Sequence, residues 1–268
     1  MGIELLAFGL DGVVFDTESA HLHACRAAFG EAGLELDWDT RQFREAARVR
    51  GAAHALNTAI DALPSEGMAN KSARQLVSSL TEARTRHFLA TIRAEAPVVQ
   101  PGFSRLMEDA LSSGCKLAIV TDLPAQAVTT LLERGFGNAF DQLFSVIVSG
   151  ADFEAGGGRS PHDLALRTTG VEAHRGVAIH NAAPALRAAQ LAGIWTVAVT
   201  PYDKEVACIS GANLWCPQLQ ELQELRELAD PRRALRESAS PRRFVDFGTL
   251  SALRRSRVAH KPGQGTIA

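Results

Sequence analysis

The chain lacks long hydrophobic runs, and its aromatic content is low, with one tyrosine and three tryptophans in 268 residues. A membrane helix needs roughly 18 consecutive apolar residues, and no stretch reaches that length. The apolar run at residues 3–8 contains Glu4 and has no basic residue before it, so it indicates a buried strand and not a signal peptide. We therefore expect a cytoplasmic protein with no membrane association.

Cysteine is also scarce. The four cysteines show neither CxxC spacing nor a histidine at zinc-ligand spacing, which argues against a disulfide framework and a zinc site. These residues are Cys25, Cys115, Cys208 and Cys216. We expect them to be reduced thiols packed inside the protein.

Five short apolar runs each end in a polar or glycine-containing turn and lead into a helical pattern. They are residues 3–8, 116–120, 144–148, 176–179 and 195–199. This alternation is typical of a parallel sheet wound with helices. The sequence therefore predicts an α/β protein with a Rossmann-like parallel sheet core.

Residues 17–97, between the first two predicted strands, have the apolar spacing of helices and contain no convincing strand. The expected helices are residues 21–32, 39–49, 53–63 and 71–94. Such a bundle would form a helical cap inserted after the first strand. We thus expect a core domain of residues 1–16 and 98–230, a cap subdomain of residues 17–97, and a separate tail.

The tail, residues 231–268, holds eight arginines and one lysine against two acids, so its net charge is +7 and that of the remainder about −9. A leucine repeat at residues 219–228 predicts a last helix, which Pro231 would end. Beyond it the chain is rich in Arg, Ser, Pro and Gly, and we expect weak order with a short helix near residues 249–255. Either an acidic protein partner or no partner at all fits this composition. Nucleic-acid binding is a weaker alternative, because no known nucleic-acid motif is present.

Four sequence blocks carry a resemblance to a known family. They are AFGLDGVVFDTESAH from Ala7, LDWDTRQFREAARVRG from Leu36, QPGFSRLMEDALSSGCKLAIVTD from Gln100 and GVAIHNAAPALRAAQLAGIWTVAVT from Gly176. Over about residues 3–225 the chain resembles the haloacid dehalogenase superfamily. It is similar in particular to the CbbY-type phosphosugar phosphatases, relatives of β-phosphoglucomutase.

The resemblance implies a carboxylate nucleophile, an acid/base carboxylate two residues later, a hydroxyl and a lysine that hold the phosphoryl group, and Mg²⁺. Gly9 stands at the nucleophile position and has no side chain, so the covalent route is lost. Asp11 stands at the acid/base position, where a turn aspartate that bonds the local backbone is an equal alternative. Thr121 matches the phosphate-binding hydroxyl, or simply ends a strand.

The positions that would hold magnesium and the lysine are also changed. His180 and Asn181 occupy the positions of the family's acidic metal ligands, and a neutral amide and an imidazole suit Mg²⁺ poorly. His162 or His174 could approach His180, but we expect a hydrogen-bonded histidine there and not a metal ligand. The lysine position falls near Gly156, or at Arg159 if a gap is allowed, and arginine is not an equivalent replacement. We expect no cofactor; Mg²⁺ would be required only if the chain were an active phosphatase.

In the cap, the resemblance implies that Glu18 and His21 face the ligand, and Arg48 or Arg50 could bind an anion. Together these changes favour a protein of phosphatase fold that binds a phosphosugar, another small anion or a protein partner without phosphatase chemistry. The alternative is an active phosphosugar phosphatase working by a nonstandard route, with water activated by Asp11 or His180.

Overall fold

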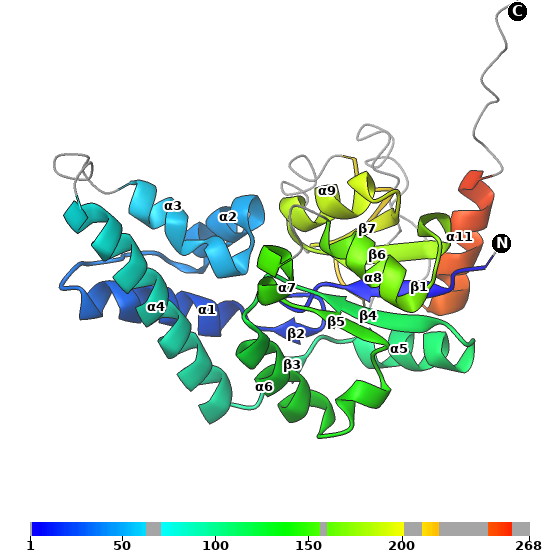
Figure 1. The fold of residues 1–268 in the computed structure, drawn as a ribbon, viewed down its shortest axis with the longest axis horizontal. Coiled ribbons are helices and arrows are strands. Elements are labelled where there is room, and N and C mark those ends of the chain that lie inside the picture. The colour runs from blue at the N-terminus through cyan, green and yellow to red at the C-terminus, as the bar shows by residue number, and fades with distance from the viewer. Residues whose placement is uncertain (1, 63–70, 156–159, 201–210, 220–245, 259–268) are drawn as a thin grey trace, which may run out of the picture.

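A computed structural model describes residues 2–62, 71–155, 160–200, 211–219 and 246–258. Six parallel strands form the central sheet in the order β5-β4-β1-β6-β7-β8 (Figure 1). Their bounds are β1 Leu5–Phe8, β4 Lys116–Val120, β5 Val146–Val148, β6 Gly176–His180, β7 Trp195–Val199 and β8 Leu214–Cys216. The sheet confirms the predicted α/β class and Rossmann-like core.

Strand β1 lies at the centre of the sheet because both of its faces are apolar. Leu6 and Phe8 pack into one hydrophobic cluster, while Leu5 and Ala7 pack into another on the opposite face. All four residues are fully buried, as expected for a parallel strand that is covered on both sides. Phe8 is level with Ile179 of β6, so the residues that follow each strand meet at one edge of the sheet.

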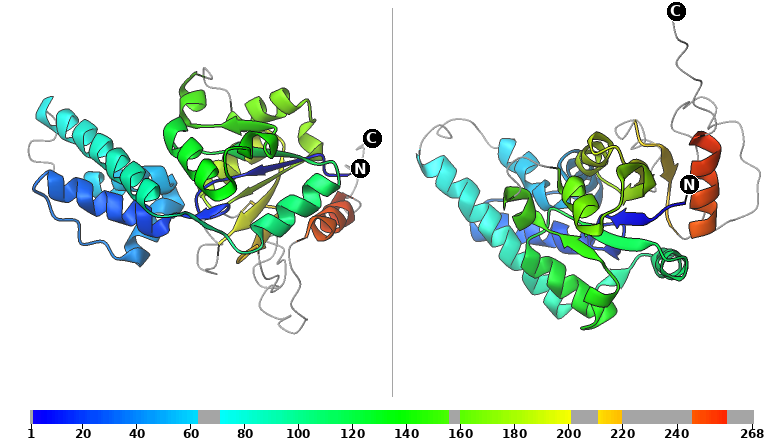
Figure 2. Two further views of the ribbon diagram at one scale, coloured as in Figure 1. Left: turned by 90° about the horizontal axis from the view of Figure 1, so that it is seen from below. Right: turned by 45° about the vertical axis from the view of Figure 1, so that its right-hand side comes forward.

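Helices cover both faces of this sheet (Figure 2). Residues of α5 (Phe103–Ser112) and α6 (Ala125–Phe136) share the cluster of Leu6 and Phe8, while residues of α8 (Pro161–Thr169) and α9 (Ala183–Leu191) pack on the other face. The remaining elements of the core are α7 Gly150–Ala155 and the 3₁₀ turns η2 Phe140–Gln142 and η3 Ala173–Arg175.

Residues 18–94 form a helical insert, which lies beside the sheet in Figure 1. Its elements are α1 Glu18–Glu31, α2 Thr40–Arg50, η1 Ala52–His54, α3 Leu56–Asp61 and α4 Lys71–Ala94. A short antiparallel ribbon of β2 (Phe15–Asp16) and β3 (Val98–Val99) joins the two ends of the insert to the core. The insert has its own hydrophobic cluster, which includes Phe29, Phe43 and Leu80.

Local sequence explains where α2 begins. Asp39 accepts a hydrogen bond from the Gln42 backbone amide, and the Gln42 side chain accepts one from the Asp39 amide. This reciprocal capping box satisfies two amides that the first turn leaves without helical partners. It sets the register of α2, and therefore which of its side chains face the core.

Two features differ from the sequence-based expectations. Strand β8 was not expected, because Leu214–Cys216 is only three residues long. The short helix expected near residues 249–255 is present as α11 (Phe247–Val258), but instead of showing weak order it packs against α5. Phe247 and Leu250 are buried in the same core cluster as residues of α5. The rest of the tail and the predicted leucine-rich helix after Leu219 lie outside the described residues.

The described cysteines, Cys25, Cys115 and Cys216, are buried free thiols, while Cys208 lies outside the described residues. None of the helices in the described part of the chain combines the length and apolar composition that a membrane span requires.

Candidate functional site

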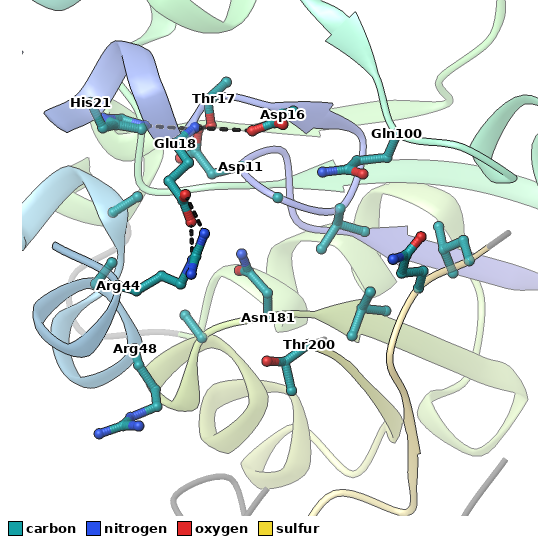
Figure 3. Close-up of a pocket in the computed structure, with 18 of the residues that line it drawn as sticks. Asp11, Asp16, Thr17, Glu18, His21, Arg44, Arg48, Gln100, Asn181 and Thr200 are labelled. Atoms are coloured by element: carbon teal, nitrogen blue, oxygen red, sulfur yellow. Dashed lines mark hydrogen bonds and ion pairs between the residues drawn. The ribbon is translucent and has the colours of Figure 1, made fainter. Parts of the chain in front are cut away.

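A cavity of about 440 Å³ lies between the carboxyl edge of the sheet and helices α1 and α2 of the insert (Figure 3). Its polar lining includes three acids, two arginines and several uncharged side chains. These residues are Asp11, Asp16, Thr17, Glu18, His21, Arg44, Arg48, Gln100, Asn181, Thr200 and Gln218. Ligands of open parallel sheets bind at this edge, so the cavity is the candidate functional site.

Gly9, the first residue after β1, is in close contact with His180, the last residue of β6. A Cβ atom placed on Gly9 would lie 2.7 Å from His180 Nδ1, closer than real Cβ contacts allow. The two residues come from neighbouring strands, and His180 is 2% exposed. The imidazole of His180 therefore fills the space into which a side chain at position 9 would project.

His180 is held in this place by a second buried histidine. His162, near the start of α8, lies with its Nε2 atom 2.9 Å from Nε2 of His180, and the two rings meet edge to face. One Nε2 must carry a proton and donate while the other accepts, so the two rings cannot both be protonated imidazolium ions. Burial lowers the pKa of His162 to about 4, and burial together with the neighbouring His162 lowers the pKa of His180 well below its usual range. The expectation that His162 or His174 approaches His180 is therefore met by His162, as a hydrogen-bond partner.

This histidine pair predicts loss of stability in mild acid. Unfolded histidine titrates near pH 6.5, whereas folded His162 titrates near 4, so between these values the unfolded chain binds more protons. The free energy of unfolding should be highest above about pH 6.5 and fall by roughly 3 kcal/mol towards pH 4 from His162 alone. Urea denaturation at pH 7.5 and pH 5, with His162→Gln as the control that flattens this dependence, measures the effect. Equal pH slopes for the two proteins would contradict it.

Asp11 lies on the loop after β1 and faces the cavity, with its side chain 11% exposed. Its Oδ1 atom accepts hydrogen bonds from the Thr17 hydroxyl at 2.7 Å and from His21 Nε2 at 2.9 Å. Burial by itself would raise the pKa of Asp11, but the interaction with the His21 ring, the hydrogen bond from Thr17 and the charge of Arg84 outweigh it, so the pKa is lowered. Asp11 is therefore an ionised carboxylate held by two side chains, those of Thr17 and His21.

His21 connects Asp11 to a buried arginine of α4. Arg84, 3% exposed, donates from Nη2 to Nδ1 of His21, so Nε2 carries the ring proton and donates to Asp11. Burial and the Arg84 charge lower the pKa of His21, and they outweigh the opposing effect of Asp11. The ring is therefore neutral. The ring also stacks on Phe88 at a centroid distance of 4.0 Å. His21 lines the cavity, as expected for a residue that faces the ligand, and its hydrogen bond also fixes Asp11 in position.

Glu18 also lines the cavity, where it forms an ion pair with Arg44 of α2. Arg44 donates from Nε and Nη2 to the two carboxylate oxygens, at 2.5 and 2.7 Å. Arg48 lies one turn further along α2 and lines the same cavity. Arg50 does not: it pairs with Asp61 of α3 at 2.5 Å and lines a different groove on the insert. The prediction that Arg50 faces the ligand is therefore wrong, because the helical rotation of two residues turns it to the other side of α2.

Thr121 does not line the cavity. Its side chain is buried, and its hydroxyl oxygen accepts a hydrogen bond from the Leu123 amide, so it closes the local turn after β4. Next to it, the carboxylate of Asp122 lies 3.5 Å from His54 Nε2 of the insert. Burial and the charge of Asp11 raise the pKa of Asp122, against the opposing effect of His54. Because Thr121 is buried and is not among the residues that line the cavity, the phosphate role expected for it has no support in its surroundings.

The residues present do not fit a magnesium ion. Gly9 supplies no ligand, the His180 ring occupies the space beside it, and Asn181 offers a neutral amide. Among the described residues, no group of three or more His, Cys, Asp or Glu side chains is arranged to hold a metal ion. Arg159 and Gly156, the candidates for the lysine position, lie outside the described residues.

Sequence reasoning missed Arg44, Arg84 and the uncharged lining residues Gln100 and Thr200. Arg44 could have been found, because it lies four residues before Arg48 and therefore on the same helix face. No local pattern distinguishes Arg84 from the other arginines of α4. Its role depends on the packing of α4 against α1, which brings it to a residue 63 positions away in sequence.

This sheet, its insert and the cavity between them define a haloacid dehalogenase-like hydrolase fold. A family model described as haloacid dehalogenase-like hydrolase matches residues 3–193, and the chain belongs to this family.

Within this family, the chain is similar to CbbY proteins and to β-phosphoglucomutases. Protein CbbY of Cupriavidus necator is 29% identical over 218 residues, which are 81% of this chain and 86% of that protein. CbbY of Cereibacter sphaeroides is 28% identical over 194 residues, 72% of this chain and 82% of that protein. Among solved structures, a CbbY mutant from Rhodobacter sphaeroides in complex with xylulose-1,5-bisphosphate has a TM-score of 0.65 and 24% identity, covering 82% of this chain and 96% of that chain. A β-phosphoglucomutase from Clostridium difficile has a TM-score of 0.68 and 17% identity, covering 96% and 100%.

Proposed function

We propose that this CbbY-like chain has lost phosphatase chemistry and binds a phosphosugar or another small anion in the 440 Å³ cavity without hydrolysing it. The observation that carries the proposal is the contact between Gly9 and His180. A covalent route needs a carboxylate at the position of Gly9, and the His180 ring leaves no room for one.

Binding is supported by what the site retains. The cavity volume is in the range of small-molecule sites. Arg44 and Arg48 bring positive charge to its wall, and Asp11 and Asn181 bring hydrogen-bonding groups. The helical insert, which we propose to act as a cap, covers these residues.

Phosphate release from a panel of sugar phosphates with Mg²⁺ tests the loss of chemistry. We expect no release above the buffer rate, because both the nucleophile and the metal ligands are missing. Thermal shift with the same compounds and no metal tests binding, since a ligand of the folded state raises its melting temperature. Magnesium-dependent release by the wild-type protein would overturn the proposal.

An active phosphatase with a nonstandard route is the second candidate, and Asp11 is the observation that favours it. Its carboxylate faces the cavity and is ionised, as a group that takes a proton from water must be, although its lowered pKa makes it a weak base. General base help alone supplies about 10²- to 10⁴-fold, which is small for an enzyme. If release were seen, Asp11→Asn should abolish it; release unaffected by this change would remove Asp11 from the mechanism.

A separate proposal concerns the basic tail. An acidic protein partner for residues 231–268 is supported by their net charge of +7, with nucleic acid as the weaker alternative. Because Phe247 and Leu250 belong to the core, the test should keep helix α11 and compare pull-downs with the wild-type protein and with a variant in which Arg232, Arg233, Arg236, Arg242 and Arg243 are changed to Gln.

A further inference from the structure

We infer that the ligand of this cavity carries a single anionic group, which binds at the α2 side, and presents hydroxyl groups to the uncharged side chains of the core. The inference rests on the function proposed above and names the ligand class. It depends on how charge is distributed over the two walls of the cavity.

The α2 wall provides one cation that has no ion-pair partner among the described residues. Arg44 and Arg48 are four residues apart on α2 and so share a helix face, and Figure 3 draws both on the insert side of the cavity. Glu18 neutralises Arg44 through its two hydrogen bonds. Arg48 has no such acid: its Nε atom is buried and has no hydrogen-bond partner among the described residues. A buried donor without a partner is costly, and an anionic ligand group would supply one.

Helix α9 adds to the positive field at this end. Helix α2 packs against α9, and Ala182, the residue before α9, lines the cavity together with Arg48. No side chain caps this helix start, so the positive end of the helix dipole is directed towards the same region. One anionic group can therefore be held between α2 and the start of α9.

The core wall has acidic and uncharged polar side chains. Its polar side chains are Gln100, Asn181, Thr200 and Gln218, which suit the hydroxyl groups of a sugar. Of the described residues that line the core side, none is a cation, whereas Asp11 and Asp16 are acids. A second phosphate on this side would meet repulsion from these carboxylates, and His180 fills the space beside Gly9.

Calorimetric titration with one sugar in three charge states tests the inference. Xylulose is the chosen parent sugar because the solved CbbY complex contains its 1,5-bisphosphate. In magnesium-free buffer, xylulose 5-phosphate should bind about 10-fold tighter than xylulose, the ratio expected for one added charge-assisted contact. Xylulose 1,5-bisphosphate should bind no tighter than the monophosphate.

Variants of the α2 wall test the position of the anionic group. Arg48→Gln should weaken binding of the monophosphate about 10-fold and leave binding of xylulose unchanged. Glu18→Gln should strengthen binding of the monophosphate, because it removes one negative charge from the cavity wall. Arg41→Gln is the matched control: Arg41 is on the same helix but pairs with Glu45 outside the cavity, and its substitution should change neither affinity.

The outcomes separate the inference from the function on which it rests. Bisphosphate binding 10-fold tighter than monophosphate binding, or no effect of Arg48→Gln, would overturn the inference and leave ligand binding without hydrolysis intact. No binding of any of the three compounds would overturn both. Phosphate release during the titration would overturn the proposed function.

Discussion

Gly9→Asp, the substitution that restores the missing carboxylate, should by itself destabilise the protein and give no phosphatase activity. Its Cβ would lie 2.7 Å from His180 Nδ1, and the new carboxylate would be buried beside two neutral histidines. The His180 ring cannot easily move, because it is buried against His162. Overpacking and the burial of a charge together should lower the free energy of unfolding by about 2–4 kcal/mol, measured by urea denaturation at pH 7.5.

Substitution of His180 tests whether the contact with its ring causes the loss of stability at position 9. Gly9→Ala, which adds only the clashing atom, should cost about 1–3 kcal/mol in the wild-type background and much less in His180→Ala, where the ring is gone. If the changes in the free energy of unfolding caused by Gly9→Ala and His180→Ala were additive, the contact between positions 9 and 180 would not be the reason that a side chain at position 9 is unfavourable. Any attempt to restore catalysis must therefore change His180 together with Gly9 and Asn181.

Arg84→Met should produce the other large effect, a loss of about 3–5 kcal/mol in the free energy of unfolding. The change removes the buried cation that bonds His21 and partly compensates the charge of Asp11. Because Arg84 lowers the pKa of His21 while Asp11 raises it, the pKa of His21 should also rise in the variant. Denaturation at pH 7.5 measures the first effect, and NMR titration of the His21 ring measures the second.

Arg86→Met is the control for this experiment, because Arg86 lies on the same helix in an exposed ion pair with Glu31. Exposed pairs contribute little, so its loss should stay below about 1 kcal/mol. Similar losses for the two arginines would mean that the buried network contributes no more than a surface pair.

The candidate site was only partly predictable from sequence. The family resemblance of the first sequence block implied Asp11, Glu18 and His21, and these residues line the cavity. Arg50 and Thr121 were predicted by the same reasoning but do not, because the rotation of α2 directs Arg50 to Asp61 and a local hydrogen bond turns the Thr121 hydroxyl inward. A pattern places a residue near a strand end or on a helix, but the direction of its side chain depends on neighbours.

Sequence alone determined the α/β fold, the position of the insert and the absence of a carboxylate at position 9. These depend on short-range properties: apolar runs that form buried strands, helical spacing, and the identity of one residue. Only the tertiary structure decided that His180 fills the space beside Gly9, that His162 holds it there, and that Arg84 reaches Asp11 through His21. Such contacts join residues far apart in the chain, and they arise from strand register and helix packing, which no local segment encodes.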